Sequence, residues 1–393
     1  MKRICSSLLT FAIVGVIFAG VCYSQVMVGK TYYNSGRGDY SPEKDLPGKV
    51  RNCLGLIQKS LQQAGMDMEN VVTSYCYLED PELYPEFNKV YGEFFTKNPP
   101  TRTTLGVPDV PGESRLEITC IAYNDLSEMK VIGSAPAGFP FSSGILAGTT
   151  LYISGKGDQL PGGGHPDTFE EQVRQTMRNI ESVLKEAGLD FRHVVMSHIF
   201  LDDYDNYGMT NKVYSEFFDY GDEPARATVF VDWIPGGSHI EITCIATTDL
   251  SKRKVVRPAS MKYGPEGMAF TASPAVWADD TLYMSALSGF YPDEGITTVN
   301  LEAQTLQMMK NQSDVLEAAG MNLSNVVSGT VYLRNINDYA PMNKVYYSQF
   351  KKGEGVRVRT CLMPNSGYEK NDIRVWTSFI AAKNAVSVRR RRE

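Results

Sequence analysis

The chain has 393 residues, of which 42% are hydrophobic, 21% charged and 11% aromatic, and its formal net charge is -6. This composition excludes a disordered or collagen-like chain, and the length suggests two or three folded domains. The acidic balance gives no basic face for nucleic acid, and we interpret the single basic run, 389–392, as a solvated tail.

The first 24 residues differ from the rest of the chain. Lys2 and Arg3 precede a run of apolar and small residues, which is the pattern of an export signal. We expect cleavage after Ser24, so that the protein is periplasmic or secreted. Because about 18 apolar residues can also span a bilayer, an uncleaved membrane anchor stays open as an alternative.

The next residues predict one folding unit. A strand is expected near 31–39, and a helix over 49–65 is expected to end on Gly65, a residue suited to the turn after a helix. Residues 71–80 alternate as in a strand, and 82–95 predict a second helix. The segments that begin at Arg102 and Arg115 are then expected to form a closing pair of neighbouring strands.

This unit, about 120 residues long, occurs three times. The motif NKVY begins at Asn88, Asn211 and Asn343, and repeats at that spacing indicate tandem domains. The two helices can cover one face of each mixed sheet, while the other, half-apolar face needs a partner. Three units on one chain can cover one another. In each copy a glycine precedes the asparagine by 23 residues: Gly65, Gly188 and Gly320.

The cysteines and histidines do not indicate a metal site. Five cysteines remain beyond the signal, which is an odd number without a CxxC pair, and the four histidines show no metal-ligand spacing. We therefore predict neither a disulfide scaffold nor a bound metal.

The aligned repeats resemble the Rid family, the YjgF proteins once labelled L-PSP endoribonucleases. The resemblance covers nearly the whole chain after the signal and rests on the AG-(L/M)-x-x-x-x-VV segment, the N-x-x-Y helix, the P-A-R-A-T strand start and the I-E-I-x-x-I-A strand. It implies an α+β fold of three tandem chorismate-mutase-like domains that form an intramolecular pseudo-trimer. The expected domains span 25–130, 131–255 and 256–385, followed by a basic tail over 386–393.

The resemblance also implies an activity. Deaminases of this family hydrolyse enamines and imines such as 2-iminopropanoate to 2-keto acids and ammonia, in clefts between subunits. An arginine holds the substrate carboxylate by a bidentate pair, and a carboxylate relays protons for the attacking water. Neither a metal nor an organic cofactor is needed.

The family's site residues map onto each repeat in turn. The glutamate, fifteen residues after the arginine, is Glu117 in the first repeat and Glu241 in the second. Because we expect the two strands to be paired, each glutamate should lie beside the arginine of its own repeat. The third repeat places Arg374 there, or Trp376 with a two-residue gap, so it is predicted to have lost the carboxylate. The carboxylate-binding arginines are Arg102, Arg226 and Arg359.

Further candidates surround these positions. The family's helix asparagine matches the first residue of each NKVY motif. The tyrosine of its P-Y-S segment is replaced by Phe141 in the second repeat and Ala272 in the third. The cysteine two residues after the arginine corresponds to Thr104, Thr228 and Cys361, and backbone approach to a ligand is expected at Ser35, Gly36, Ser154 and Gly155.

Three functions stay open. The first is an enamine/imine deaminase whose third site is degenerate. The second is a non-catalytic protein that binds small carboxylates in the same clefts, favoured by the missing tyrosines and the export signal. The third, a ribonuclease, is opposed by the acidic composition. The expected partner is thus a small carboxylate and not nucleic acid, and the protein is expected to be a monomer. The arginines and glutamates could also be ordinary surface ion pairs.

Overall fold

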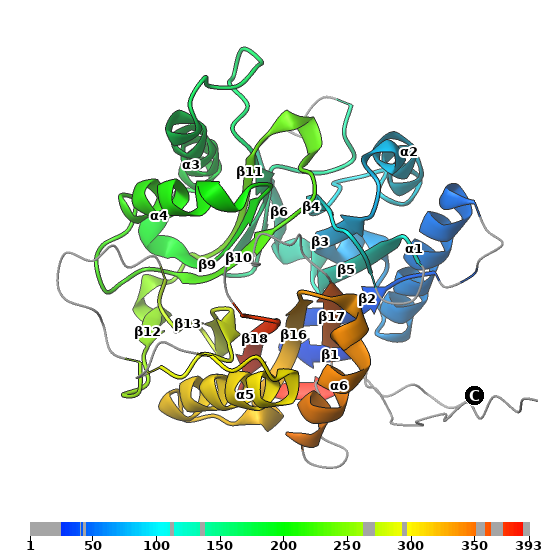
Figure 1. The fold of residues 1–393 in the computed structure, drawn as a ribbon. Helices are drawn as coiled ribbons and strands as arrows, with labels where there is room; N and C mark the ends of the chain where they lie inside the picture. Colours follow the sequence, from blue (N-terminus) through cyan, green and yellow to red (C-terminus); the bar gives the residue numbers. More distant parts are fainter. Residues whose placement is uncertain are drawn as a thin grey trace, which may run out of the picture.

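A computed structural model describes residues 25–39, 41, 45–110, 114–133, 138–261, 272–292, 297–350, 358–362 and 372–387. The expected export signal and residues 388–393 of the expected tail lie outside these ranges. Within them, no helix is both long enough and apolar enough to cross a membrane. The ribbon contains three sheets flanked by helices (Figure 1).

Each repeat builds one sheet and two long helices. The first sheet has the order β19-β1-β2-β5-β3-β4, and the second has the order β10-β9-β11-β8-β7-β6. The first contains β1 (Gln25–Val28), β2 (Thr31–Arg37), β3 (Val71–Leu78), β4 (Thr101–Gly106), β5 (Leu116–Tyr123) and β19 (Ala385–Ser387). The second contains β6 (Met129–Ile132), β7 (Gly144–Ala147), β8 (Thr150–Lys156), β9 (Val194–Leu201), β10 (Ala225–Phe230) and β11 (Ile240–Thr247).

The third sheet has the order β12-β13-β14-β18-β16-β17, and β15 also pairs with β18. Its strands are β12 (Lys254–Val256), β13 (Ala275–Ala278), β14 (Thr281–Met284), β15 (Leu287–Ser288), β16 (Val326–Leu333), β17 (Val358–Leu362) and β18 (Val375–Ala382). The long helices of the three repeats are α1 (Leu46–Gln63) and α2 (Tyr84–Phe94), α3 (Phe169–Glu186) and α4 (Tyr207–Ser215), and α5 (Leu301–Ala318) and α6 (Tyr339–Ser348).

The predicted order of elements in a repeat is confirmed. In the second repeat, for example, β7 and β8 are followed by α3, β9, α4, β10 and β11. The glycine after the first helix has a left-handed backbone in all three repeats, which L side chains rarely adopt and which ends the helix. Its φ is +77° at Gly65, +75° at Gly188 and +70° at Gly320.

One expectation about strand pairing is wrong. β4 and β5 do not pair with each other, because both pair with β3, β4 in parallel and β5 antiparallel. A parallel neighbour needs a crossover connection, and α2 provides it between β3 and β4. The alternation of apolar residues identified β4 and β5 as strands, but it carries no information on whether β3 lies between them.

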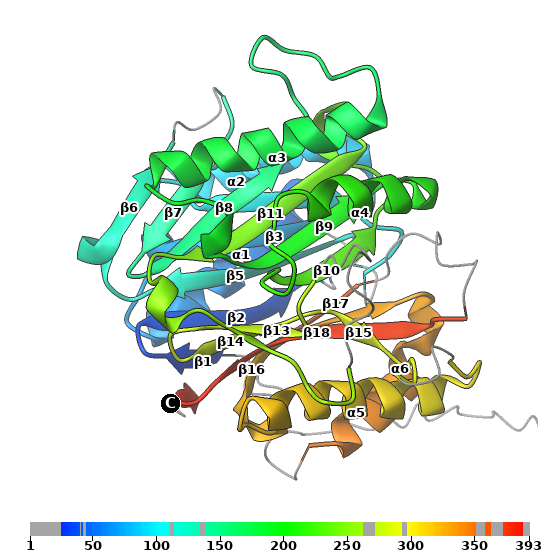
Figure 2. The ribbon, with the colours of Figure 1, turned by 90° about the vertical axis from the view of Figure 1, so that its left-hand side faces the viewer.

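The sheets pack against helices on one face and against one another on the other. In Figure 2, α3 and α4 lie on one side of the sheets, and α5 and α6 lie on the opposite side. One core cluster joins equivalent residues of all three repeats, among them Tyr33, Tyr152 and Tyr283. The half-apolar sheet faces thus cover one another, as the sequence predicted, and their burial favours the association of the repeats.

The last strand of the chain completes the first sheet. β6 pairs with β7 and β12 pairs with β13, so each of these strands adds an edge to the sheet of the repeat that follows it. β19 does the same for the first repeat, with Val26 opposite Ser387 and Val28 opposite Ala385. These three edge strands span the domain boundaries expected at 130, 255 and 385.

This pairing predicts that the C-terminal strand stabilises the protein. A chain that ends at Ala382 lacks the ladder with β1 and exposes that edge, so we expect the free energy of unfolding to fall by about 1–3 kcal/mol. Thermal melts should show a lower midpoint than for the matched chain that ends at Ser387, which keeps β19. Equal midpoints for the two chains would contradict this role.

Candidate functional site

The candidate arginines lie at junctions between successive repeats. The backbone N–H of Arg102, on β4, donates to the Oγ of Ser154 on β8 of the next repeat, at 2.9 Å. In the same way the N–H of Arg226, on β10, donates to the Oγ of Ser285 at 2.8 Å. Each arginine strand therefore docks on the second strand of the following repeat, and residues of two repeats surround each arginine; we call the surroundings of Arg102 the Arg102 cleft.

The side chain of Arg102 is held in place and leaves one edge free. It is 3% exposed, and its Nη2 donates to Oδ1 of Asn88 at 2.6 Å and to the hydroxyl of Tyr84 at 3.2 Å. The ring centres of Phe141 and Tyr91 lie 4.8 and 4.9 Å from its Cζ. Its Nη1 is buried and has no hydrogen-bond partner in the described part of the chain. A carboxylate oxygen is a suitable acceptor for this donor.

The carboxylate that interacts with Arg102 is Glu241, which comes from β11 of the second repeat. Burial raises the pKa of Glu241 to about 8, and the charges of Arg102 and Lys156 act in the opposite direction. Burial likewise lowers the pKa of Lys156 to about 8, against the attraction of Glu241. The side chains of Glu241 and Lys156 thus both have a pKa of about 8, and Glu241 interacts with the guanidinium of Arg102. Such an arrangement is suited to acid–base chemistry.

Glycine makes room for the carboxylates. A Cβ on Gly155 would overlap the carboxyl group of Glu241, and a Cβ on Gly36 would overlap that of Glu117. Both glycines lie on the second strand of their own repeat. They were expected to allow the backbone to approach a ligand, and in the described structure they accommodate a glutamate side chain.

The expectation that each arginine lies beside the glutamate of its own repeat is wrong. β3 separates β4 from β5, so Arg102 is in register with Ser74, whereas Glu117 is in register with Tyr77 across the other edge of β3. Glu117 instead lies against Gly36 on β2, and β2 contacts β17, the strand that carries Arg359. The side chain of Arg359 lies outside the described part of the structure.

Trp376 takes the glutamate position in the third repeat. It is opposite Tyr332 on β16, as Glu117 is opposite Tyr77 and Glu241 is opposite Phe200. The interpretation with a two-residue gap is therefore the right one. Arg374, the other candidate, forms an ion pair with Asp338 at 2.5 Å.

The Trp376 side chain belongs to the cleft of Arg226. Both residues line one cavity of about 400 Å³, together with Ser285 and Thr228. Because Trp376 replaces the glutamate of the third repeat, Arg226 of the second repeat has a tryptophan beside it at the position where a carboxylate was expected.

The remaining candidates lie in different surroundings. Oγ1 of Thr104 and Oδ1 of Asn211 are buried without a hydrogen-bond partner among the described residues, whereas Asn88 accepts from Arg102. Ser35 lies on β2 next to Gly36, and Asn343 lies on α6. The side chain of Cys361, like that of Arg359, is outside what the structure describes.

Sequence reasoning missed three residues of the Arg102 cleft. Lys156 directly follows Gly155, and the equivalent residue is Arg37 in the first repeat and Leu287 in the third. The aligned repeats therefore did show a cation at this position in two copies. Tyr84 contacts Arg102, and Trp233 packs against Tyr84 with ring centres 6.1 Å apart. Trp233 comes from the second repeat, where no local pattern marks a contact with the first.

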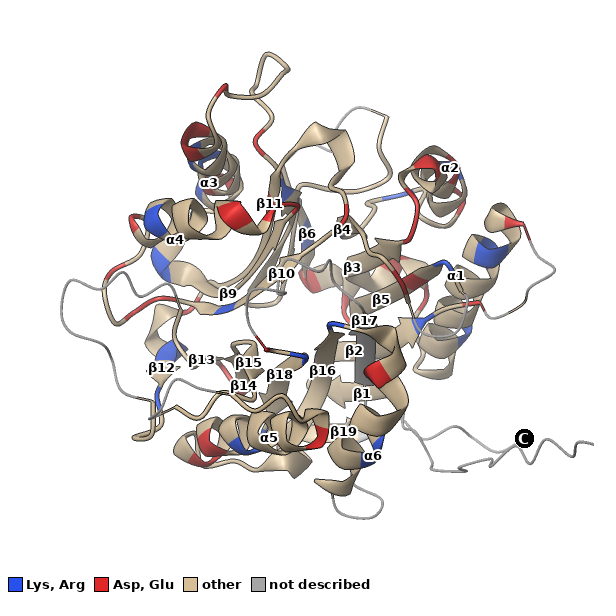
Figure 3. Cartoon of the chain, viewed as in Figure 1, with Lys and Arg blue, Asp and Glu red and all other residues tan. Residues whose placement is uncertain are grey.

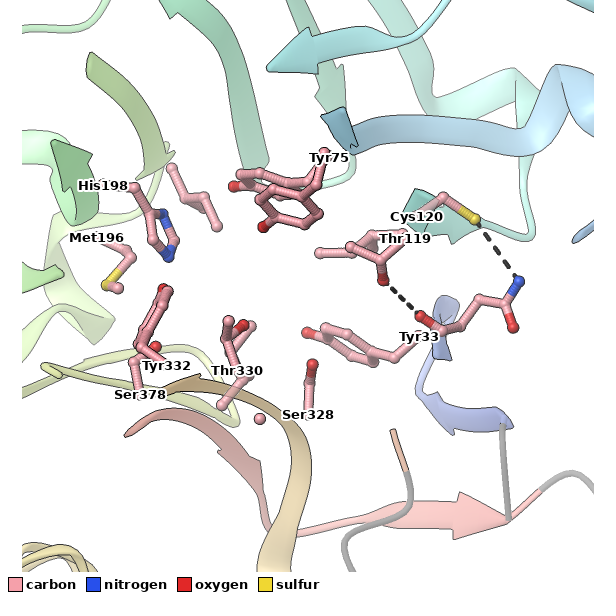
Figure 4. Close-up of a pocket in the computed structure, with 16 residues that line it drawn as sticks. Tyr33, Tyr75, Thr119, Cys120, Met196, His198, Ser328, Thr330, Tyr332 and Ser378 are labelled. Carbon is pink, nitrogen blue, oxygen red and sulfur yellow. Dashed lines mark hydrogen bonds between the residues drawn. The ribbon is translucent and has the colours of Figure 1, made fainter. Parts of the chain in front are cut away.

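A second, smaller cavity lies where the three sheets meet (Figure 4). It has a volume of about 60 Å³ and is lined by 16 residues, none of which is Asp, Glu, Lys or Arg. Tyr75, His198 and Thr330 are equivalent residues of the three repeats and all face it. Burial lowers the pKa of His198 to about 4, so its ring is neutral at pH 7. This cavity has no cation to hold a carboxylate.

Comparisons with known proteins identify relatives of the three repeats. A family model described as endoribonuclease L-PSP matches residues 17–124, 132–248 and 268–365. The mouse 2-iminobutanoate/2-iminopropanoate deaminase is 38% identical over 122 residues, which cover 30% of this chain and 90% of that protein. Protein DfrA of Myxococcus xanthus is 39% identical over 118 residues, which cover 28% of this chain and 86% of its own length.

Two solved structures are among those similar to this chain. A Rid family protein from Yersinia pestis is 32% identical, with a TM-score of 0.29, and covers 30% of this chain and 99% of its own. A chorismatase matches 80% of this chain and 93% of its own with a TM-score of 0.56 at 11% identity, which shows a shared fold alone. Because the family model matches three successive segments that span most of the sequence, the protein belongs to the endoribonuclease L-PSP (Rid) family and carries three tandem copies of its domain.

Proposed function

We propose that the protein hydrolyses 2-imino acids, or related imines, to 2-keto acids and ammonia in clefts between its domains. The observation that carries the proposal is the Arg102 cleft, where a buried guanidinium with one free edge interacts with the carboxyl group of Glu241. The name of the mouse relative supports the same chemistry.

The geometry suggests a short sequence of steps. The substrate carboxylate binds to Nη1 of Arg102, while Asn88 and Tyr84 hold the rest of the guanidinium. Glu241 takes a proton from a water molecule as the oxygen attacks the imine carbon, and passes that proton to the imine nitrogen. Glu241 then takes the remaining proton of the new hydroxyl group and passes it to the amine nitrogen, so that the C–N bond breaks, ammonia leaves and the keto group remains. One water is consumed and one ammonia is released.

Two of the three clefts are proposed to be competent. The first joins Arg102 to Glu241, and the second would join Arg359 to Glu117, because β17 contacts β2 as β4 contacts β8. The cleft of Arg226 has Trp376 in place of a carboxylate and is proposed to be inactive. The whole chain would then be a monomer that replaces a trimer of single domains, exported through its N-terminal segment.

The description of the family as endoribonucleases finds little support in the charges. Figure 3 shows Lys and Arg interspersed with Asp and Glu on the helices around the outside of the molecule. A phosphate backbone is bound by a basic stripe or patch. The proposed imine hydrolysis instead relies on the interacting side chains of Arg102, Glu241 and Lys156.

The first test removes the carboxylates. Glu241→Gln should lower imine hydrolysis by about half, because the Glu117 cleft continues to work, and Glu117→Gln/Glu241→Gln should lower it at least about 100-fold. An amino-acid oxidase would generate 2-iminobutanoate in the presence of residues 25–393, and its decay would be followed. Glu216→Gln, an exposed glutamate on the outer surface, is the matched control. A folded double variant with the full rate would refute the proposal.

The raised pKa of Glu241 predicts a pH dependence. The carboxylate form accepts the proton, and because burial raises its pKa to about 8, that form becomes dominant only above this pH. In a Glu117→Gln chain, kcat/KM corrected for spontaneous decay should therefore rise with pH through about 8. A profile that is already flat by pH 6 would exclude Glu241 as the base.

The glycine beside Glu241 offers a subtler test. In Gly155→Ala the new Cβ would occupy the space of the carboxyl group, so Glu241 must turn away from the cleft. We expect the rate of a Glu117→Gln/Gly155→Ala chain to fall at least tenfold below that of Glu117→Gln alone. Gly162→Ala, where a Cβ meets nothing within 4 Å, should leave that rate unchanged. Equal rates for the two alanine variants would show that Gly155 does not position Glu241.

A further inference from the structure

The cavity between the second and third repeats contains a buried cation, and the described residues that line this cavity include no carboxylate. Arg226 is 7% exposed, and its Nη1 has no hydrogen-bond partner in the described part of the chain. Its Cζ lies 5.4 Å from the ring centre of Tyr214. A buried charge without a partner is costly, and a carboxylate is the ligand whose two oxygens match a guanidinium.

The space in front of Arg226 suits a larger ligand. The cavity has a volume of about 400 Å³, within the range of roughly 300–1,000 Å³ usual for small-molecule sites. Among the described residues that line it, Arg226 is the one that carries a charge. The described lining also includes five aromatic side chains: Tyr204, Tyr207, Phe230, Phe290 and Trp376.

Three linked differences make this wall apolar. Where the Arg102 cleft has Glu241, Lys156 and Gly155, this cleft has Trp376, Leu287 and Ala286 at the equivalent positions. The carboxylate, the neighbouring cation and the glycine that makes room for the carboxylate have thus been replaced together. A polar wall suited to proton transfer has become a hydrophobic one.

A fourth difference opens the cavity on the other side of the arginine. In the Arg102 cleft the ring of Phe141 lies 4.8 Å from the guanidinium carbon. Ala272 is the equivalent residue beside Arg226, and it lines the cavity. The missing ring leaves volume next to the cation that a ligand can fill.

We infer that this cleft is a separate binding site for aromatic monocarboxylates, which it holds without hydrolysing them. The carboxylate binds to Arg226, and the ring packs among Phe230 and Trp376, where aromatic contacts add to the burial of apolar area. The binding part of this inference stands on the geometry of the cavity. The absence of turnover rests on the proposed function, because it assigns the proton transfer to the glutamate that is lacking here.

The test is direct binding of 3-phenylpropanoate, with propanoate as its small counterpart, to residues 25–393 by calorimetry. We expect one strong site per chain and an affinity for 3-phenylpropanoate at least tenfold above that for propanoate. Arg226→Ala should weaken binding at least tenfold without lowering the melting midpoint, whereas Arg102→Ala should retain binding. No binding, or binding that Arg102→Ala removes and Arg226→Ala retains, would overturn the inference.

A second variant separates this inference from the proposed function. Trp376→Glu/Ala286→Gly recreates the polar wall, so it should bind 3-phenylpropanoate at least tenfold more weakly, whether or not any cleft hydrolyses imines. Binding as tight as in the parent chain would overturn the aromatic site. For turnover, imine hydrolysis that persists in Glu117→Gln/Glu241→Gln and is lost on adding Arg226→Ala would show that this cleft is catalytic.

Discussion

The hydrogen bond from the backbone N–H of an arginine to a serine hydroxyl of the next repeat fixes where each cleft can form. It joins Arg102 to Ser154 and Arg226 to Ser285, so the arginine strand of one repeat lies against the second strand of its successor. A single repeat can supply a cation or a carboxylate but not both walls. The three apolar sheet faces that pack together at the centre hold these junctions in register.

Burial at the junction determines the chemistry. Water is excluded from the space around Arg102, which leaves a guanidinium donor unpaired and raises the pKa of Glu241 to about 8. Both effects cost folding free energy and must be offset elsewhere by packing. At the junction between the second and third repeats, Trp376 stands in place of the glutamate, so the cost of burying a carboxyl group does not arise there. The same backbone therefore presents two different environments, one with the titratable groups of Glu241 and Lys156 and one lined by aromatic side chains.

The sequence was sufficient for the local elements and for the residue types of the site. Helix ends at Gly65, Gly188 and Gly320, the strand patterns and the repeated arginines all follow from short-range signals. Pairing across the sheet did not follow, because the alternation in β4 and β5 is the same whether or not β3 lies between them. For that reason Arg102 was assigned to Glu117, although the structure brings it near Glu241.

The residues around Arg102 that sequence analysis did not identify lie at a junction between two repeats. Trp233 packs against Tyr84, which contacts Arg102 in another repeat, and such a contact leaves no periodic trace in the sequence. Lys156 acts on Glu241, and its only trace is the cation Arg37 at the equivalent position of the first repeat. Trp376 was weighed against Arg374, and only the register with Tyr332 decides between them. Comparing the repeats position by position shows which residues differ, whereas the three-dimensional arrangement shows which differences share a cleft.

The pairing of β19 with β1 has a consequence for biosynthesis. A ribosome makes β19 only after all the other described strands, so the edge of the first sheet at β1 waits for its partner while the second and third repeats are made. An open strand edge is a template for pairing with other chains. The second and third sheets receive their edge strands before the rest of their repeats and have no such delay. The nascent chain is thus most exposed to misassembly at its first repeat, until β19 emerges and pairs with β1.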